Sequence, residues 1–194
     1  MGSTPDPVAL HDGQHDATAA RYDLDAETVR DLRRWSVAAG VVRRGDDVLL
    51  VQNRRRNGSL DWSTPGGVID LGEQPVEALT REVREETGLT VGGWGAPIYE
   101  VEVVAPDAGF HLRVVAHLAV VGSISGMIHI DDPDGIVETA DFVDLTTARA
   151  HLLDGPPWVH EPLLAHLEDG VADGRRFGYR LDGAHLATAQ LHRR

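Results

Sequence analysis

The stretch GVIDLGEQPVEALTREVREETGL, residues 67–89, contains the pattern around which the rest of this chain is organised. It begins with a glycine turn, continues as a loop, and then takes the pattern of an amphipathic helix. Pro75 suits the first helical position and Gly88 suits the residue just past the helix end. Spacings of three and four residues predict one buried face on this helix, formed by Val76, Leu79 and Val83.

Three glutamates crowd another face of the predicted helix. Glu82, Glu85 and Glu86 stand at positions i, i+3 and i+4 and therefore lie on one side. Two carboxylates about 5 Å apart repel by roughly 3 kcal/mol at an effective dielectric constant near 20. Solvated glutamates on an exposed face are one explanation, because water would remove most of that repulsion. The glycine-rich stretch 64–67 before the helix favours another, since backbone carbonyls there can approach a bound cation.

Such a cation would define the chemistry of the stretch. Carboxylate and carbonyl oxygens are hard ligands that suit Mg²⁺, or Mn²⁺, and not zinc. A metal held in this way would neutralise a diphosphate and polarise phosphorus, while one carboxylate could deprotonate water. The residues therefore predict metal-assisted attack of water on a phosphoanhydride.

Composition limits the classes of function. With 194 residues, 42% of them hydrophobic, the chain can form one domain with terminal extensions. The net charge of -13 argues against binding of extended nucleic acid, and all 18 basic residues are arginine, which excludes lysine chemistry. We see no apolar run long enough to span a membrane and no signal peptide. Without cysteines, a cytoplasmic protein with no disulfides and no membrane partner is the simplest interpretation.

The order of the expected elements predicts an α/β fold with a mixed sheet. Residues 1 to about 25 show no clear period, and we expect a mobile arm there. The expected helices are residues 26–35, with Asp25 as N-cap, 75–87, 147–153 and 159–170. The expected strands are residues 37–42, 47–53, 97–106, 110–121 and 136–145, with a strand or hairpin in 175–190. The first two strands form a hairpin, which argues against an all-parallel sheet.

Two features next to the central stretch are candidates for substrate contact. The arginines Arg54, Arg55 and Arg56 could bind phosphate, or could form an ordinary charged loop. Trp62 could stack on a base or sugar, or could be a buried aromatic that anchors its loop.

The central stretch resembles the Nudix box. Gly67, Glu73 and residues 81–89 match that motif at each position it specifies. The resemblance implies a Nudix-like α/β/α sandwich with a mixed sheet over residues 35–170. Residues 1–34 would then be an N-terminal arm with a short helix, and residues 171–194 a C-terminal extension.

The resemblance also implies roles for individual residues. Glu85 and Glu86 resemble metal ligands, Glu82 a ligand or the general base, and the Gly66 carbonyl a backbone ligand. Arg81 resembles the partner of Glu73 in an ion pair that orients the helix, so the expected catalytic residues are Arg81, Glu82 and Glu85. Several family members use one more loop carboxylate, for which the candidates here are Asp131, Asp132, Asp134 and Glu138.

The implied reaction is hydrolysis of a nucleoside diphosphate linked to another group. ADP-ribose, nucleotide sugars and (d)NTPs all remain open as the small nucleotide-type substrate. Pro106 lies seventeen residues beyond Leu89, close to a proline typical of the ADP-ribose branch, but a turn at the end of a strand explains it equally well. An alternative is a non-catalytic module that senses a nucleotide. A prenyl diphosphate isomerase is weaker, because that branch uses a cysteine. A homodimer is compatible with the C-terminal residues Phe177, Tyr179 and Leu181.

Overall fold

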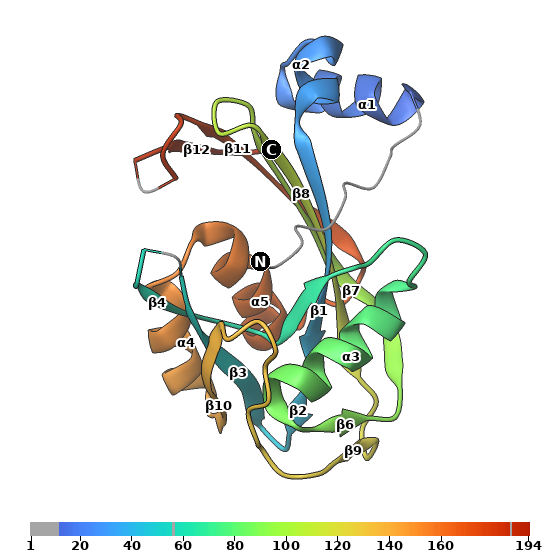
Figure 1. Ribbon diagram of the computed structural model, residues 1–194, viewed down its shortest axis with the longest axis vertical. Coiled ribbons are helices and arrows are strands. Elements are labelled where there is room, and N and C mark those ends of the chain that lie inside the picture. The colour runs from blue at the N-terminus through green and yellow to red at the C-terminus, as the bar shows by residue number, and fades with distance from the viewer. Residues whose placement is uncertain (1–11, 56, 187) are drawn as a thin grey trace.

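The computed structural model of the chain describes residues 12–55, 57–186 and 188–194. Its largest sheet is mixed and has the strand order β12-β11-β7-β8-β1-β5 (Figure 1). The neighbours β1 and β8 are parallel, as are β7 and β11, and the other pairs are antiparallel. The strands are β1 (Arg33–Val41), β5 (Gly66–Val68), β7 (Trp94–Ala105), β8 (Phe110–Ala119), β11 (Arg175–Asp182) and β12 (Gln190–Arg193). This confirms the predicted mixed sheet.

Two smaller sheets complete the strands. One has the order β10-β3-β2, with β4 also paired to β3, and the other consists of β6 and β9. Their strands are β2 (Arg43–Arg44), β3 (Asp47–Arg54), β4 (Leu60–Ser63), β6 (Thr90–Val91), β9 (Ile124–Ser125) and β10 (Val137–Val143). The acidic loop after the short strand β9 lies beside the C-terminal end of α3, where His129 N–H donates to the Thr87 carbonyl (2.9 Å). The loop is therefore held beside the carboxylate helix.

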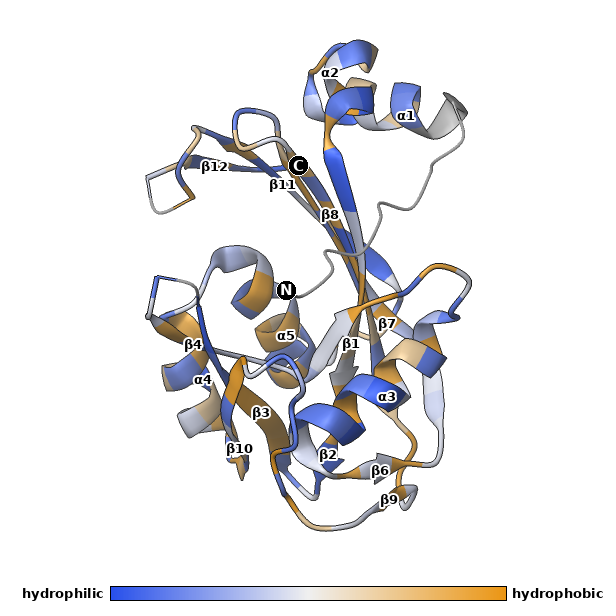
Figure 2. Cartoon of the chain, in the orientation of Figure 1, coloured by the Kyte–Doolittle hydropathy of each residue, from blue (hydrophilic) through white to orange (hydrophobic). Residues whose placement is uncertain are grey.

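Helices cover the sheets on both sides, which confirms the predicted α/β/α sandwich. α3 (Pro75–Thr87) packs against β1 and β5, while α4 (Leu145–Leu153) and α5 (Pro157–Asp169) pack on the other side (Figure 1). A hydrophobic core lies on each side, one beneath α3 and one beneath α5. Figure 2 shows the strands between the helices as hydrophobic and much of the outer face of α3 as hydrophilic. No helix in the described part of the chain is long and apolar enough to cross a membrane.

The N-terminal segment differs from the sequence expectation. Residues 12–22, expected to belong to a mobile arm, form the helix α1 (Asp12–Tyr22), and the Tyr22 side chain is fully buried. The next helix, α2 (Ala26–Asp31), is capped as predicted by Asp25, which accepts from Thr28 N–H (2.7 Å). It ends four residues earlier than expected, because the chain turns into β1, whose Trp35 pairs with Leu112 of β8.

The C-terminal residues extend the large sheet. In the region where we expected a strand or hairpin, β11 and β12 are antiparallel, and β11 pairs in parallel with β7. The long strands β1, β7 and β8 project beyond the layer of α3, and α1 and α2 lie at their far end (Figure 1). Both terminal segments are therefore attached to one projecting part of the sheet.

Candidate active site

The carboxylate helix α3 is fixed at both ends. Gln74 N–H donates to the Glu77 carboxylate (3.0 Å) before Pro75, and Gly88 ends the helix with a φ of 73°. The buried residues of α3 are Ala78, Leu79, Val83 and Thr87. Val76, which we expected on this face, is 38% exposed, so that prediction was wrong. Val76 lies in the first turn, beyond the part of the helix that contacts the sheet.

A glycine turn holds the other side of the site. Gly66 has a φ of 148°, and a Cβ atom there would overlap the Ala38 carbonyl of β1. A Cβ atom on Gly67 would overlap the carboxyl group of Glu82. Because neither residue has a side chain, β5 approaches α3 closely enough for Gly66 N–H to donate to Glu86 Oε2 (2.8 Å).

Glu86 is the most perturbed carboxyl group of the site. Burial raises its pKa to about 8, and the charges of Glu82, Asp132 and Glu85 add to that effect, while the hydrogen bond from Gly66 opposes it. Burial also raises the pKa of Glu82, where Arg81 opposes the shift and Glu85 and Asp134 add to it. The structure therefore gathers negative charge around a carboxyl group that is shielded from water.

Arg81 connects the carboxylates. Its Nε and Nη2 atoms each donate to Glu73 at 3.1 Å, and Nη1 donates to Glu82 (2.7 Å) and Glu85 (3.4 Å). The Nη2 atom also donates to the Val68 carbonyl (3.3 Å), so Arg81 joins α3 to β5. These partners raise the pKa of Arg81, and the hydrogen bond from Arg81 lowers that of Glu73. The guanidinium is therefore held in one place among three carboxylates.

The donor atoms suit a hard divalent cation. Among the residues that the structure describes, no three His, Cys, Asp or Glu side chains are arranged as a metal site, and Glu82 and Glu85 both accept hydrogen bonds from Arg81. The fit rests instead on Glu86, whose pKa is raised first by burial of its carboxyl group and further by the charges of three nearby carboxylates. A divalent cation would relieve that repulsion, and oxygen donors are those that Mg²⁺ and Mn²⁺ prefer.

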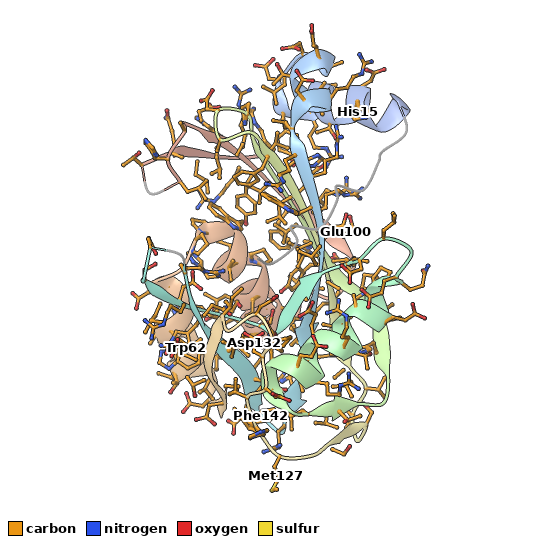
Figure 3. The ribbon with its side chains drawn as sticks, in the orientation of Figure 1. His15, Trp62, Glu100, Met127, Asp132 and Phe142 are labelled. Carbon is orange, nitrogen blue, oxygen red and sulfur yellow. The ribbon has the colours of Figure 1, made fainter. Side chains whose placement is uncertain are left out.

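The four candidate loop carboxylates have different surroundings. Asp132 Oδ2 accepts from Ile136 N–H (2.6 Å) and Val137 N–H (2.8 Å), so its charge stabilises the loop, although it also lines the site (Figure 3). Glu138 is paired with Arg54, and Asp131 is exposed outside the groove lining. Asp134 lines the groove and lies near Glu82.

Of the described residues predicted to contact substrate, only Arg55 lines the groove. Arg55 lines the groove and forms a bidentate ion pair with Asp61 (2.6 and 2.7 Å), whereas Arg54 pairs with Glu138. Arg56 lies outside the described residues. Trp62, which is labelled in Figure 3, stacks on His151 of α4. The ring centroids are 4.4 Å apart, so the Trp62 ring joins β4 to that helix.

A groove of about 1530 Å³ runs from the carboxylates along the large sheet. Our interpretation of the sequence missed its far part, which is lined by Trp35, Tyr99, Phe110, Trp158, Leu181 and Leu191. Alternation is the signal that could have revealed one wall, because Trp35 and Val37 in β1 and Phe110, Leu112 and Val114 in β8 fall on one face. Nothing in the sequence indicates that β11 and β12 would close the groove.

Comparisons with known proteins agree with the fold. A family model described as NUDIX domain matches residues 33–167. A MutT-like protein of Streptomyces ambofaciens is 51% identical over 53 residues, which are 27% of this chain and 33% of that protein. An ADP-ribose pyrophosphatase of Methanocaldococcus jannaschii is 32% identical over 76 residues, covering 36% of this chain and 45% of that protein. This chain therefore spans less than half the length of these two relatives.

A solved structure supports the same architecture. A NUDIX hydrolase from Nitrosomonas europaea superposes with a TM-score of 0.60 at 19% identity, covering 72% of this chain and 91% of that one. At this level of identity, the likeness concerns the fold.

Proposed function

Since the NUDIX domain model covers more than half of the chain, the chain belongs to that family, and we propose that it is a Mg²⁺-dependent pyrophosphohydrolase. Its substrate is a nucleoside diphosphate linked to another group. The observation that carries the proposal is the environment of Glu86. Burial and three neighbouring carboxylates raise its pKa to about 8, which is the arrangement that a divalent cation stabilises.

The proposed metal site consists of oxygen atoms from the glycine turn and α3. Glu82, Glu85, Glu86 and the Gly66 carbonyl would hold Mg²⁺, with Mn²⁺ as a substitute. When bound, the cation neutralises the diphosphate and polarises the phosphorus that water attacks. Nudix hydrolases generally use a divalent metal, and the donor atoms here suit that use.

Side chains around that site position the carboxylates and accept protons. Arg81 positions Glu82 and Glu85 through its Nη1 atom. Burial raises the pKa of Glu82, which makes its carboxylate a better proton acceptor at neutral pH. Asp134 is our choice for the assisting loop carboxylate, because it lines the groove and Asp132 is already bonded to backbone N–H groups. Arg55 is our choice among the arginines for contact with phosphate.

A substrate panel tests the proposal. The full chain would be incubated with ADP-ribose, a nucleotide sugar and several (d)NTPs, with Mg²⁺ or with EDTA, and the released phosphates measured. We expect Mg²⁺-dependent turnover of at least one substrate, abolished in Glu86→Gln. Glu168→Gln is the matched control, because Glu168 lies on α5 and pairs with Arg149. Absence of turnover throughout, with wild type equal to Glu86→Gln, would overturn the proposal.

One observation favours the alternative of a nucleotide-sensing module. Within the described residues, the carboxylates engage Arg81 and Gly66 and do not form a metal cluster. Calorimetry separates the two functions. Tight nucleotide binding that requires no Mg²⁺, without turnover of any substrate, would favour the sensor.

A further inference from the structure

The groove has two ends of different chemistry. We call the part around Glu82, Glu86 and Asp134 the carboxylate end. The other part, the apolar end, is lined by Trp35, Tyr99, Phe110, Trp158, Leu181 and Leu191. A continuous groove of about 1530 Å³ exceeds the usual size of a small-ligand pocket, so it has room for more than a diphosphate.

Strand pairing shows how far apart the two ends of the groove lie along β1. On β1, Ala39 pairs with Gly66 and Val37 pairs with Val68, and Trp35 is the next residue on the same face. With about 3.3 Å per residue, Trp35 lies roughly 13 Å along the strand from Ala39. A ribose and its phosphates bridge such a distance. A ligand whose phosphates lie at the carboxylate end would therefore extend over the apolar floor.

The floor of the apolar end consists of aligned rows of apolar side chains. Trp35 pairs with Leu112, which in turn pairs with Val103. The next row contains Phe110, which pairs with Ala105, and the rings of Trp35 and Phe110 are 5.8 Å apart. Among the described residues that line the groove, those of the sheet and of the C-terminal hairpin include no charged side chain. The charged residues of this region, such as Arg55, Asp61 and Asp154, belong to the opposite wall.

The wall at the apolar end lies outside the residues that match the family model. Leu181 and Leu191 are paired across β11 and β12, which lie beyond residues 33–167 that match the family model. Glu161 of α5 holds this hairpin by accepting from Tyr179 Oη (3.0 Å) and from Arg193. On its other side, Arg180 Nη1 donates to the carbonyls of Tyr22 (2.6 Å) and Asp23 (2.8 Å). The hairpin is therefore fixed in place as a wall.

These observations indicate which part of a nucleotide fits the apolar end of the groove. Flat aromatic rings stack on aromatic side chains and gain from burial against leucines. A sugar would lose water from its hydroxyl groups on a floor that offers few hydrogen-bond partners. For the same reason, the floor and the hairpin would not distinguish the edges of one base from those of another by hydrogen bonds.

We propose that the apolar end, closed by the C-terminal hairpin, binds the nucleobase of the substrate by stacking and burial. The site therefore requires a base but discriminates weakly among bases. This inference rests on the proposed function for its substrate class, since the phosphates are placed at the carboxylate end. It assigns to β11 and β12 the role of a substrate-binding wall.

Direct binding tests the inference independently of turnover. Four nucleoside 5′-diphosphates (adenosine, guanosine, cytidine and uridine) and inorganic pyrophosphate would be titrated into the full chain with Mg²⁺. The measurements are calorimetry and tryptophan fluorescence, because Trp35 and Trp158 line the apolar end. We expect the four Kd values to agree within about tenfold and pyrophosphate to bind about tenfold more weakly or worse.

Variants of the hairpin locate the base. Leu191→Asp and Leu186→Asp introduce charge into the wall, and Leu186 is already 50% exposed, so its change does not endanger folding. Both variants should raise the Kd values of all four nucleotides by about tenfold and leave the Kd of pyrophosphate unchanged. His185→Asp is the matched control, because His185 is exposed in the turn between β11 and β12 and does not line the groove.

The outcomes separate this inference from the proposed function. Base-dependent binding without turnover would support the inference and overturn the hydrolase. Turnover with unchanged Kd values in both leucine variants would overturn the inference and leave the hydrolase standing. A change of oligomeric state in Leu191→Asp by analytical ultracentrifugation, with nucleotide binding unaltered, would assign the apolar end to an interface between two copies and overturn the inference.

Discussion

The carboxylate helix with its glycine turn and the two terminal segments, residues 12–32 and 171–194, are built by contacts of different range. In the first region, Gly66 and Glu86 are joined by a hydrogen bond across 20 residues of chain. In the second, Tyr22 bonds to Glu102 across 80 residues, and Arg180 reaches Tyr22 across 158. The difference implies that the proposed chemistry depends on one local stretch, whereas the far end of the groove depends on the C-terminal hairpin, which the N-terminal segment supports from behind.

Replacing Glu85 by alanine should give the largest effect and would test the local half of that comparison. Loss of a proposed metal ligand should lower kcat/KM by about 1,000-fold, which corresponds to ~4 kcal/mol of transition-state stabilisation. In EDTA the same change should leave the free energy of unfolding unchanged or slightly raised, because one of several repelling carboxylates is removed. Steady-state kinetics and urea unfolding measure the two quantities. Normal turnover in Glu85→Ala would contradict the proposed site.

Gly67→Ala should give the next largest effect and would sharpen the comparison. The added methyl group would overlap the Glu82 carboxyl, which lies at the end of a side chain that can move aside. We therefore expect turnover to fall by about 100-fold through misplacement of Glu82, with less than about 1 kcal/mol of lost stability. Gly92→Ala is a suitable control, because the nearest atom to a Cβ there is 3.4 Å away. If Gly67→Ala unfolds the chain instead, the turn contributes to folding as well as to chemistry.

Tyr22→Phe addresses the long-range half of the comparison. The Tyr22 hydroxyl donates to the buried Glu102 carboxylate (3.1 Å), which is also bonded to His111 Nε2 (3.0 Å). Removing one donor should lower the free energy of unfolding by about 1–2 kcal/mol, because Glu102 stays buried. Turnover should be unchanged, since this network lies on the face of the sheet opposite the groove. A large loss of activity at constant stability would break the comparison.

The same contrast explains how much the sequence could predict. The helix 75–87 and its ends at Pro75 and Gly88 followed from spacing and capping, which act within a few residues. The α/β/α sandwich was implied only by the resemblance to the Nudix box. Val76 was misassigned because periodicity does not indicate where the sheet beneath a helix ends. The N-terminal helix was missed because α1 is weakly amphipathic, and its burial depends on Glu102 and Val104 far along the chain.

The parts of the candidate site were predictable to different degrees. The crowding of Glu82, Glu85 and Glu86 was visible from their spacing, since i+3 and i+4 positions share a helix face. The preference for Asp134 over Asp132 was not, because it depends on which carboxylate already accepts from backbone N–H groups. The apolar end required knowledge that Leu191 pairs with Leu181 at the edge of the same sheet.

The pH dependence of Glu161→Gln should give the smallest effect and would show whether charge holds the hairpin. The hydrogen bond from Arg193 lowers the pKa of Glu161, burial opposes this, and Tyr179 adds to the lowering. Because the folded-state pKa lies below the ordinary value of 4.5, ionised Glu161 stabilises the fold above that pH. This stabilisation is lost as the pH falls through the lower, folded-state pKa.

Near neutral pH, Glu161→Gln should therefore lower the free energy of unfolding by about 0.5–1 kcal/mol relative to wild type. The difference should shrink as the pH falls below 4.5, because the wild-type carboxylate then becomes protonated. Urea unfolding at a series of pH values measures it, with Glu168→Gln on the same helix as control. A difference that does not change with pH would mean that Glu161 holds β11 and β12 by packing and neutral hydrogen bonds. The wall of the groove would then be independent of charge, unlike the carboxylate end.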